Sequence, residues 1–162
     1  MKTLDEIFKH TLKDIYYAET ALTKALPKMA KAAGNAELQA AFEHHLDETR
    51  GQIKMLDKVF ASVGEKAAGE KCDAIEGLIK EADGLMKEAT GIALDAALIG
   101  AAQAVEHYEI ARYGTLREWA KELGHAEAHD LLSQILDQEK AANATLTGLA
   151  VKSVNMVKAK AA

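Results

Sequence analysis

The spacing of apolar residues is the feature that most limits what this chain can fold into. Through four long segments these residues recur three and four positions apart, which places one apolar stripe along an α-helix. Ala, Leu, Glu and Lys are abundant and proline occurs once in 162 residues, so the composition also favours helix. The first segment shows the spacing most completely, in Leu4, Ile7, Phe8, Leu12, Ile15, Leu22, Leu26 and Met29. The sequence therefore predicts an all-α protein of long amphipathic helices.

Turn-forming residues divide the chain into these helices. Gly34 and Asn35 supply a stop and a helix-starting cap, and Gly124 supplies a second stop. Pro27 should kink the first helix without ending it, because the apolar pattern continues beyond it. We expect helices at about 3–33, 36–63, 72–87, 92–123 and 125–157, the third of them short.

The lengths of the connections predict how the helices are arranged. Tight turns at Gly34 and Gly124 pair the four long helices into two antiparallel hairpins. The stretch 65–90 carries three glycines and dense charge around a brief apolar pattern, which is typical of a long connection. We therefore expect one domain, a ferritin-like antiparallel four-helix bundle with a short extra helix in the crossover between its second and third long helices.

Charged residues interrupt the apolar stripe in every long helix. A buried, unpaired carboxylate costs on the order of several kcal/mol, so inward-facing glutamates need compensation, and a metal cation supplies it. One histidine shares the same face. The predicted metal ligands are Glu19, His45, Glu48, Glu106, Glu109 and Glu139.

The glutamates also lie at matching heights. Glu19 and Glu48 are 15 and 14 residues from Gly34, about 22 Å along either helix at the usual rise. Glu109 and Glu139 are each 15 residues from the turn at Gly124. Carboxylates at one level can neutralise two cations about 3.5 to 4 Å apart. The sequence thus predicts a dinuclear site for iron, with manganese or zinc as alternatives.

The histidines depart from the usual di-iron pattern, which has Glu-x-x-His on two of the four helices. The positions three residues after Glu48 and Glu139 are Gly51 and Ala142. His45, three residues before Glu48, is the one imidazole on the predicted inner face, and it is either a ligand or a hydrogen-bonded core histidine.

Four further polar side chains are candidate supports of the metal ligands. Gln52 and Asn143 each follow a stripe glutamate by four residues and could be hydrogen-bond partners or weak oxygen ligands. Tyr16 and Tyr113 lie within about a turn of a stripe glutamate, where a phenol could hydrogen-bond a carboxylate or simply pack in the core.

Charge and cysteine content argue against several classes of protein. The 20 basic and 25 acidic residues give a net charge of -5, so no basic surface for nucleic acid or an anionic membrane is expected, and Lys158 and Lys160 near the end are too few to change this. No stretch approaches a membrane span, and no apolar signal segment opens the chain. Cys72 is the single cysteine and has no partner for an internal disulfide. The expected location is the cytoplasm.

Several runs of sequence carry a family resemblance. They are HLDETRGQI at 45–53, CDAIEGLI at 72–79, VEHYEIA at 105–111, YGTL at 113–116 and QEKA at 138–141. In these runs, and over essentially its whole length, the chain resembles the YciF/YciE family of bacterial stress-associated ferritin-like proteins. The resemblance implies a ferritin-like bundle, a homodimer and a rubrerythrin-like metal region. It places the six predicted ligands on helices that carry metal ligands in related bundles.

Three hypotheses of function follow. The first is a di-metal carboxylate protein of stress or oxidative defence that binds iron and consumes peroxide or oxygen; as an enzyme it would be a di-iron oxidase or peroxidase. The second is a protein that sequesters metal without turnover. The third is a metal-free dimeric interaction module whose polar core sets the register of the helices.

Overall fold

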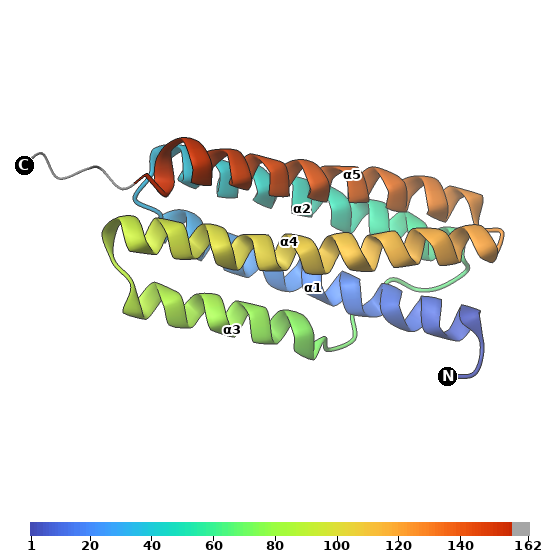
Figure 1. Cartoon of the computed structure of the whole chain (residues 1–162). Coiled ribbons are helices and arrows are strands. Elements are labelled where there is room, and N and C mark those ends of the chain that lie inside the picture. The colour runs from blue at the N-terminus through green and yellow to red at the C-terminus, as the bar shows by residue number, and fades with distance from the viewer. Residues whose placement is uncertain (157–162) are drawn as a thin grey trace, which may run out of the picture.

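The computed structural model describes residues 1–156, and these residues form five α-helices and one π-helical turn (Figure 1). Every predicted helix is present, and the bounds of the first four lie within one residue of the expected ones. The predicted helix 125–157 instead gives way to a π-helical turn at Ala150, and its expected last residue lies outside the described residues. The elements are α1 (Leu4–Ala32), α2 (Ala36–Ser62), α3 (Asp73–Glu88), α4 (Gly91–Glu122), α5 (Ala126–Leu149) and η1 (Ala150–Val154).

Local interactions account for the helix starts. Thr3 and Glu6 form a reciprocal capping box at the start of α1, since each side chain accepts a hydrogen bond from the backbone N–H of the other. The Asn35 side chain accepts from two backbone N–H groups in the first turn of α2. Pro27 lies inside α1, which continues to Ala32.

The four long helices form the expected antiparallel bundle. Around its cross-section α1 contacts α2, α2 contacts α5, α5 contacts α4, and α4 contacts α1. Figure 1 shows that α2 and α4 run in the same direction and that α3, on the outside of the bundle, runs the opposite way. The ferritin-like bundle with a helix in its crossover is therefore confirmed.

The crossover helix α3 is held against α1 and α4. Cys72, just before α3, is buried, and its sulfur lies 3.0 Å from the Tyr108 hydroxyl on α4. Ahead of it, the backbone N–H of Glu70 donates to the carbonyl of Lys13 on α1. Cys72 thus serves as a small packing residue where α3 meets the bundle.

Apolar side chains fill the bundle above and below a polar middle. On α1, buried Phe8, Leu12 and Ile15 precede Glu19, and buried Leu22 and Leu26 follow it. The other three long helices repeat this order. The polar residues are therefore sealed from both ends of the bundle by hydrophobic layers.

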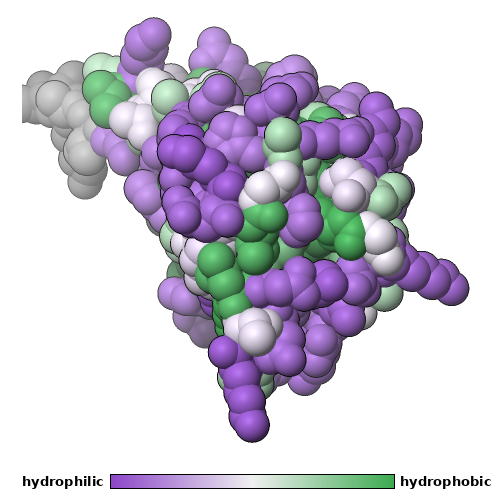
Figure 2. Space-filling view, turned by 90° about the vertical axis from the view of Figure 1, so that its right-hand side faces the viewer, coloured by the Kyte–Doolittle hydropathy of each residue, from purple (hydrophilic) through white to green (hydrophobic). Residues whose placement is uncertain are grey.

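Few large apolar side chains remain on the surface. Figure 2 views the end of the bundle where α4 joins α5, and mostly hydrophilic residues cover it. Among residues 1–156, no helix combines the length and the apolar character that crossing a lipid bilayer requires. The exposed large hydrophobic residues of the described chain are Met1, Leu4, Ile92, Val151 and Met156.

Candidate metal centre

Four of the six predicted ligands meet in the middle of the bundle. One potential ligand atom from each lies within 4.8 Å of the corresponding atoms of the others, and all four residues are buried. They come from three helices, α2, α4 and α5. We call them the inner group: His45, Glu106, Glu109 and Glu139.

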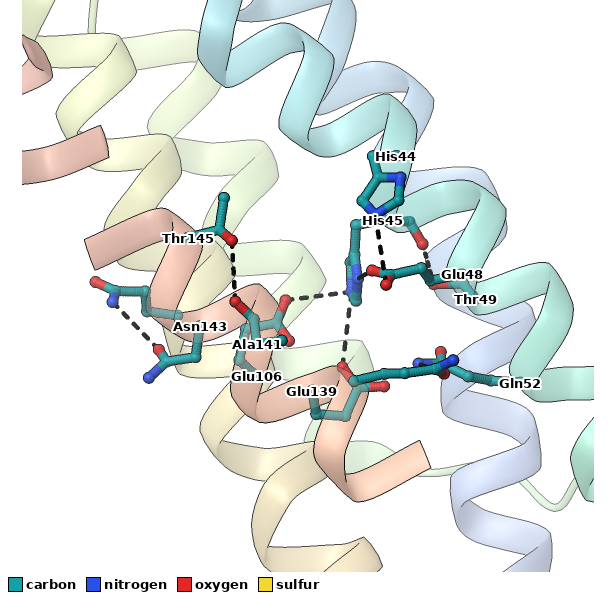
Figure 3. A network of polar contacts seen from close by, with 12 residues as sticks. His44, His45, Glu48, Thr49, Gln52, Glu106, Glu139, Ala141, Asn143 and Thr145 are labelled. Atoms are coloured by element: carbon teal, nitrogen blue, oxygen red, sulfur yellow. Dashed lines mark hydrogen bonds and ion pairs between the residues drawn. The ribbon is translucent and has the colours of Figure 1, made fainter. Parts of the chain in front are cut away.

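His45 is the centre of this arrangement (Figure 3). Its Nε2 atom lies 3.2 Å from Glu106 Oε1 and 3.9 Å from Glu139 Oε2. Its Nδ1 atom lies 3.6 Å from Glu48 Oε2, which is too long for a hydrogen bond. One imidazole from α2 therefore stands among carboxylates from its own helix and from two neighbours.

Glu48 lies at the edge of the inner group. Its side chain is 23% exposed, and Oε1 lies 3.4 Å from Nε2 of His44, a histidine on the outer surface of α2. The direct contact with the His45 side chain lowers the pKa of Glu48, and the nearby imidazole of His44 acts in the same direction. Glu48 thus connects the buried imidazole to solvent.

Glu19 lies on the α1 side and has no exposed surface. The hydroxyl of Tyr113, also fully buried, donates a hydrogen bond to Glu19 Oε1. Burial raises the pKa of Glu19 to about 8, and the charge of Glu139 adds to the effect. Glu19 therefore shares the electrostatic environment of the inner group without belonging to it.

Burial shifts the protonation of the inner group as well. It raises the pKa of Glu106 to about 7 and those of Glu109 and Glu139 well above the ordinary value, and the neighbouring carboxylates contribute to each shift. For His45, burial alone would lower the pKa, but Glu48 and the other carboxylates outweigh it and raise the pKa. With no cation bound, the centre therefore retains protons that exposed glutamates would lose.

Several polar atoms of the centre have no hydrogen-bond partner among the described residues. They include both carboxyl oxygens of Glu109 and of Glu139, and one oxygen each of Glu19 and Glu106. Buried polar atoms are nearly always paired in proteins, so a cluster of exceptions needs an explanation. Carboxylate oxygens and one imidazole nitrogen are the donors that iron, manganese and zinc take in proteins. The residues present fit a divalent metal ion.

The four predicted supporting side chains have different outcomes. Tyr113 contacts Glu19, as described above. Gln52 is buried, and its Nε2 donates to Gln138 Oε1 on α5 at 3.2 Å, while its own Oε1 has no partner. Gln138 was not foreseen as part of this region, although it directly precedes Glu139.

Tyr16 and Asn143 form hydrogen bonds with other residues and not with the predicted metal ligands. The Tyr16 hydroxyl donates to Asp57 of α2 at 3.0 Å, and Asn143 accepts from Gln103 of α4 at 3.2 Å. Asn143 follows Glu139 by four residues, so its side chain points about 40° away from that of Glu139 around the axis of α5. This direction places Asn143 at the edge of α5 that faces α4. Proximity along a helix therefore did not specify which neighbour each side chain meets.

Comparison with known proteins identifies relatives of this chain. The family described as a domain of unknown function, DUF892, matches residues 3–159. The protein YciF of Escherichia coli strain K12 is 48% identical over 157 residues, which cover 96% of this chain and 95% of YciF.

Solved structures agree with this relationship. The crystal structure of the E. coli stress protein YciF superposes with a TM-score of 0.93 at 48% identity, covering 97% of this chain and all of that one (100%). YcfI from Rhodopseudomonas palustris gives a TM-score of 0.88 at 52% identity, covering 90% and 94% of the two chains. A Xanthomonas campestris protein that is 23% identical, with a TM-score of 0.74 over 91% of both chains, shares the fold. The chain therefore belongs to the DUF892 family, the family of the bacterial stress protein YciF.

Proposed function

We propose that this protein binds a pair of metal ions, iron above all, in the middle of its bundle and acts in stress or oxidative defence. The observation that carries the proposal is the inner group, four buried ligand side chains within 4.8 Å of one another. The stress role is carried over from YciF, which is described as a stress protein.

The charges of the centre support two ions. Five glutamates, Glu19 and Glu48 with the three of the inner group, could carry five negative charges beside one imidazole. Ionising them together in a buried site is prohibitive without compensation. Two divalent cations would neutralise four of these charges, and His44 or His45 can balance the charge of Glu48, with which both pair.

The donor set favours iron or manganese over zinc. Oxygen donors outnumber nitrogen donors, and zinc sites are usually rich in histidine or cysteine. The inner group would hold the two ions together with Glu19 and Glu48. When bound, a ferrous pair supplies two electrons, enough to convert one hydrogen peroxide and two protons into two waters.

The residues of the chain itself prepare the site for such chemistry. The apolar layers above and below keep water from reaching the carboxylates through the ends of the bundle. The Tyr113 hydroxyl donates a hydrogen bond to Glu19 and so fixes the orientation of that carboxylate. The single imidazole and the buried carboxylates release protons as a cation binds.

Metal content tests the proposal directly. Protein loaded anaerobically with Fe(II) should contain about two iron ions per chain by elemental analysis. Glu139→Gln keeps the size of the side chain but removes its charge, and it should lose most of the metal. Glu127→Gln changes an exposed glutamate on the same helix and should retain it. Wild-type protein without iron, or equal iron in Glu139→Gln and wild type, would contradict the proposal.

Sequestration without turnover is a second candidate function. It is favoured by the single histidine of the inner group, because ferritin-like oxidases usually place a histidine after two of their glutamates. Iron-loaded protein that holds Fe(II) but consumes neither peroxide nor oxygen would identify this case. We also propose, from the family resemblance, that the protein is a homodimer, which light scattering can test.

A further inference from the structure

A cavity of about 90 Å³ lies between α2 and α5, beside the inner group. Its base includes His45 and Glu106, and Glu48 and the exposed His44 stand at its edge. Figure 3 looks onto this region, with His44, His45 and Glu48 on α2 and Thr145 on α5. The cavity therefore connects the outer surface of the bundle with the ligand side chains.

Small residues create this space. Ala142 follows Glu139 by three residues, so its side chain lies on the face of α5 that lines the cavity. This is the position where a Glu-x-x-His motif would place an imidazole. Ala41, four residues before His45 on α2, lines the opposite side. Two methyl groups stand where larger side chains would close the gap.

The lining restricts what can occupy the cavity. Phe42 and Leu146, together with the alanines, make its walls mostly apolar, so a large polar molecule would lose its hydration there without compensation. Glu48 and Glu106 repel anions. The volume is well above the roughly 10–15 Å³ that a cavity needs to hold one water molecule. A small uncharged molecule that can hydrogen-bond to His45 and Glu106 fits these limits.

We propose that this cavity admits and holds a small uncharged peroxide, hydrogen peroxide in the simplest case, next to the metal centre. The size of the cavity excludes larger molecules, its carboxylates repel anions, and its base offers the polar atoms that a peroxide needs. This inference rests on the proposed function for its chemical meaning, but the cavity itself can be tested without metal.

The space is tested with metal-free protein. Crystals pressurised with xenon should show a xenon atom between α2 and α5 in wild type, because apolar walls bind this gas. Ala142→Leu fills the cavity and should abolish the xenon site. Ala144→Leu, which adds the same side chain at an exposed position of α5, should retain it. Ala41→Leu closes the space from α2 and serves as the second variant if Ala142→Leu does not fold.

Access is tested with Fe(II)-loaded protein. Two ferrous ions give one electron each to hydrogen peroxide, which takes up two protons and becomes two waters. Ala142→Leu, which fills the cavity, should oxidise its Fe(II) with hydrogen peroxide at least tenfold more slowly than wild type while its iron content is unchanged. Ala144→Leu should oxidise Fe(II) at the wild-type rate.

The outcomes separate this inference from the proposed function. Absence of iron in the wild type would refute the metal centre, whereas the xenon experiment would still decide whether the cavity binds a small apolar atom. Unchanged peroxide kinetics in an iron-loaded, xenon-free Ala142→Leu would overturn the access route. If Ala142→Leu slowed the oxidation of iron by dioxygen but not by peroxide, the choice of peroxide would be wrong. If Ala142→Leu lost its iron, the cavity could not be regarded as distinct from the metal ligands.

Discussion

At the scale of single residues, the centre depends on carboxyl groups that the fold keeps in an unfavourable place. Glu19, Glu109 and Glu139 have no exposed surface, and most of their oxygens lack partners. Removing such groups from water is costly whether or not they are ionised. The burial of these carboxyl groups should therefore lower the stability of the metal-free protein.

The pH dependence of the metal-free protein follows from these groups. An ordinary glutamate has a pKa of 4.5, whereas in the folded chain the pKa of Glu106 is about 7 and that of Glu19 is about 8. Between these limits the unfolded chain loses protons that the folded chain keeps, so stability is greatest at low pH in this window and falls as pH rises. The raised pKa of His45 acts in the same direction.

We expect the thermal midpoint of metal-free protein to fall by several degrees between pH 5 and pH 8, as followed by circular dichroism. Glu139→Gln removes one of the charges and should flatten this dependence. A midpoint that rises with pH in the metal-free wild type would show that the carboxyl groups are not shifted as described.

Tyr113 of α4 donates a hydrogen bond to a carboxylate of the centre, that of Glu19. Tyr113→Phe keeps the ring but removes the donor to Glu19, leaving a buried oxygen unpaired. The metal-free protein should lose about 1 to 3 kcal/mol of unfolding free energy in urea denaturation. Tyr17→Phe, which breaks a bond to the surface residue Glu76, should cause little change. Equal effects of the two substitutions would argue against a special role for Tyr113.

At the scale of elements, the structure depends on how the connections are tied to the helices. The segment before α3 lies on α1, with the backbone of Gly69 against that of Tyr17. A Cβ atom on Gly69 would lie 3.1 Å from Tyr17 Cα, which belongs to a regular helix and cannot easily move. The crossover therefore has no room for a side chain at this point.

Two glycine substitutions should consequently have opposite effects. Gly69→Ala should lower the unfolding free energy by about 1 to 3 kcal/mol through this overlap. Gly77→Ala lies in the interior of α3 with nothing within 4 Å of the new Cβ, and it should raise the unfolding free energy by about 0.5 to 1 kcal/mol through helix propensity. Urea denaturation of the two variants measures both signs, and stabilisation by Gly69→Ala would show that the crossover can shift away from α1.

The turn between α1 and α2 is tied to α4 by a buried aspartate. Asp95 Oδ1 accepts a hydrogen bond of 2.7 Å from the backbone N–H of Gly34. Asp95→Ala should lower the unfolding free energy by about 1 to 3 kcal/mol, because it leaves this N–H without its acceptor. Asp95→Asn preserves an acceptor oxygen and should recover much of the loss. If Asn and Ala were equally destabilising, the charge and not the hydrogen bond would be responsible.

At the scale of the whole molecule, the proposed metal ions would link helices that otherwise meet through apolar packing. The inner group lies on α2, α4 and α5, and the proposed ligand Glu19 lies on α1, while α3 carries no proposed ligand. Binding to the folded state alone raises its stability with metal concentration. The effect should be concentrated in the four helices that carry ligands.

Hydrogen exchange can show this distribution. Adding Fe(II) without oxygen should raise the thermal midpoint and slow amide exchange in the central turns of the four long helices, with little change in α3. A chelator should reverse both effects in the wild type and have no effect on Glu139→Gln. Equal protection of all five helices would indicate general stabilisation, and no protection would indicate that these helices do not share a metal.

Much of this arrangement could be predicted from local patterns. The repeat of apolar residues specified four long helices, and the turns at Gly34 and Gly124 set the stripe glutamates at one height. Local patterns could not predict which side chain of a neighbouring helix each residue contacts. Tyr16 and Asn143 are as close along their helices to a glutamate as Gln52 is, yet they bond to Asp57 and Gln103 on neighbouring helices.

The sequence by itself thus determined the helices, their pairing and the family, because helix periodicity and capping depend on residues within a few positions of one another. Only the tertiary structure decided that His45, Glu106, Glu109 and Glu139 come within 4.8 Å while Glu48 stays at the edge. It alone showed that Ala142 opens a cavity of about 90 Å³ beside them. The reason is that distances across the bundle depend on how each helix is rotated about its axis, and packing among all four helices sets that rotation.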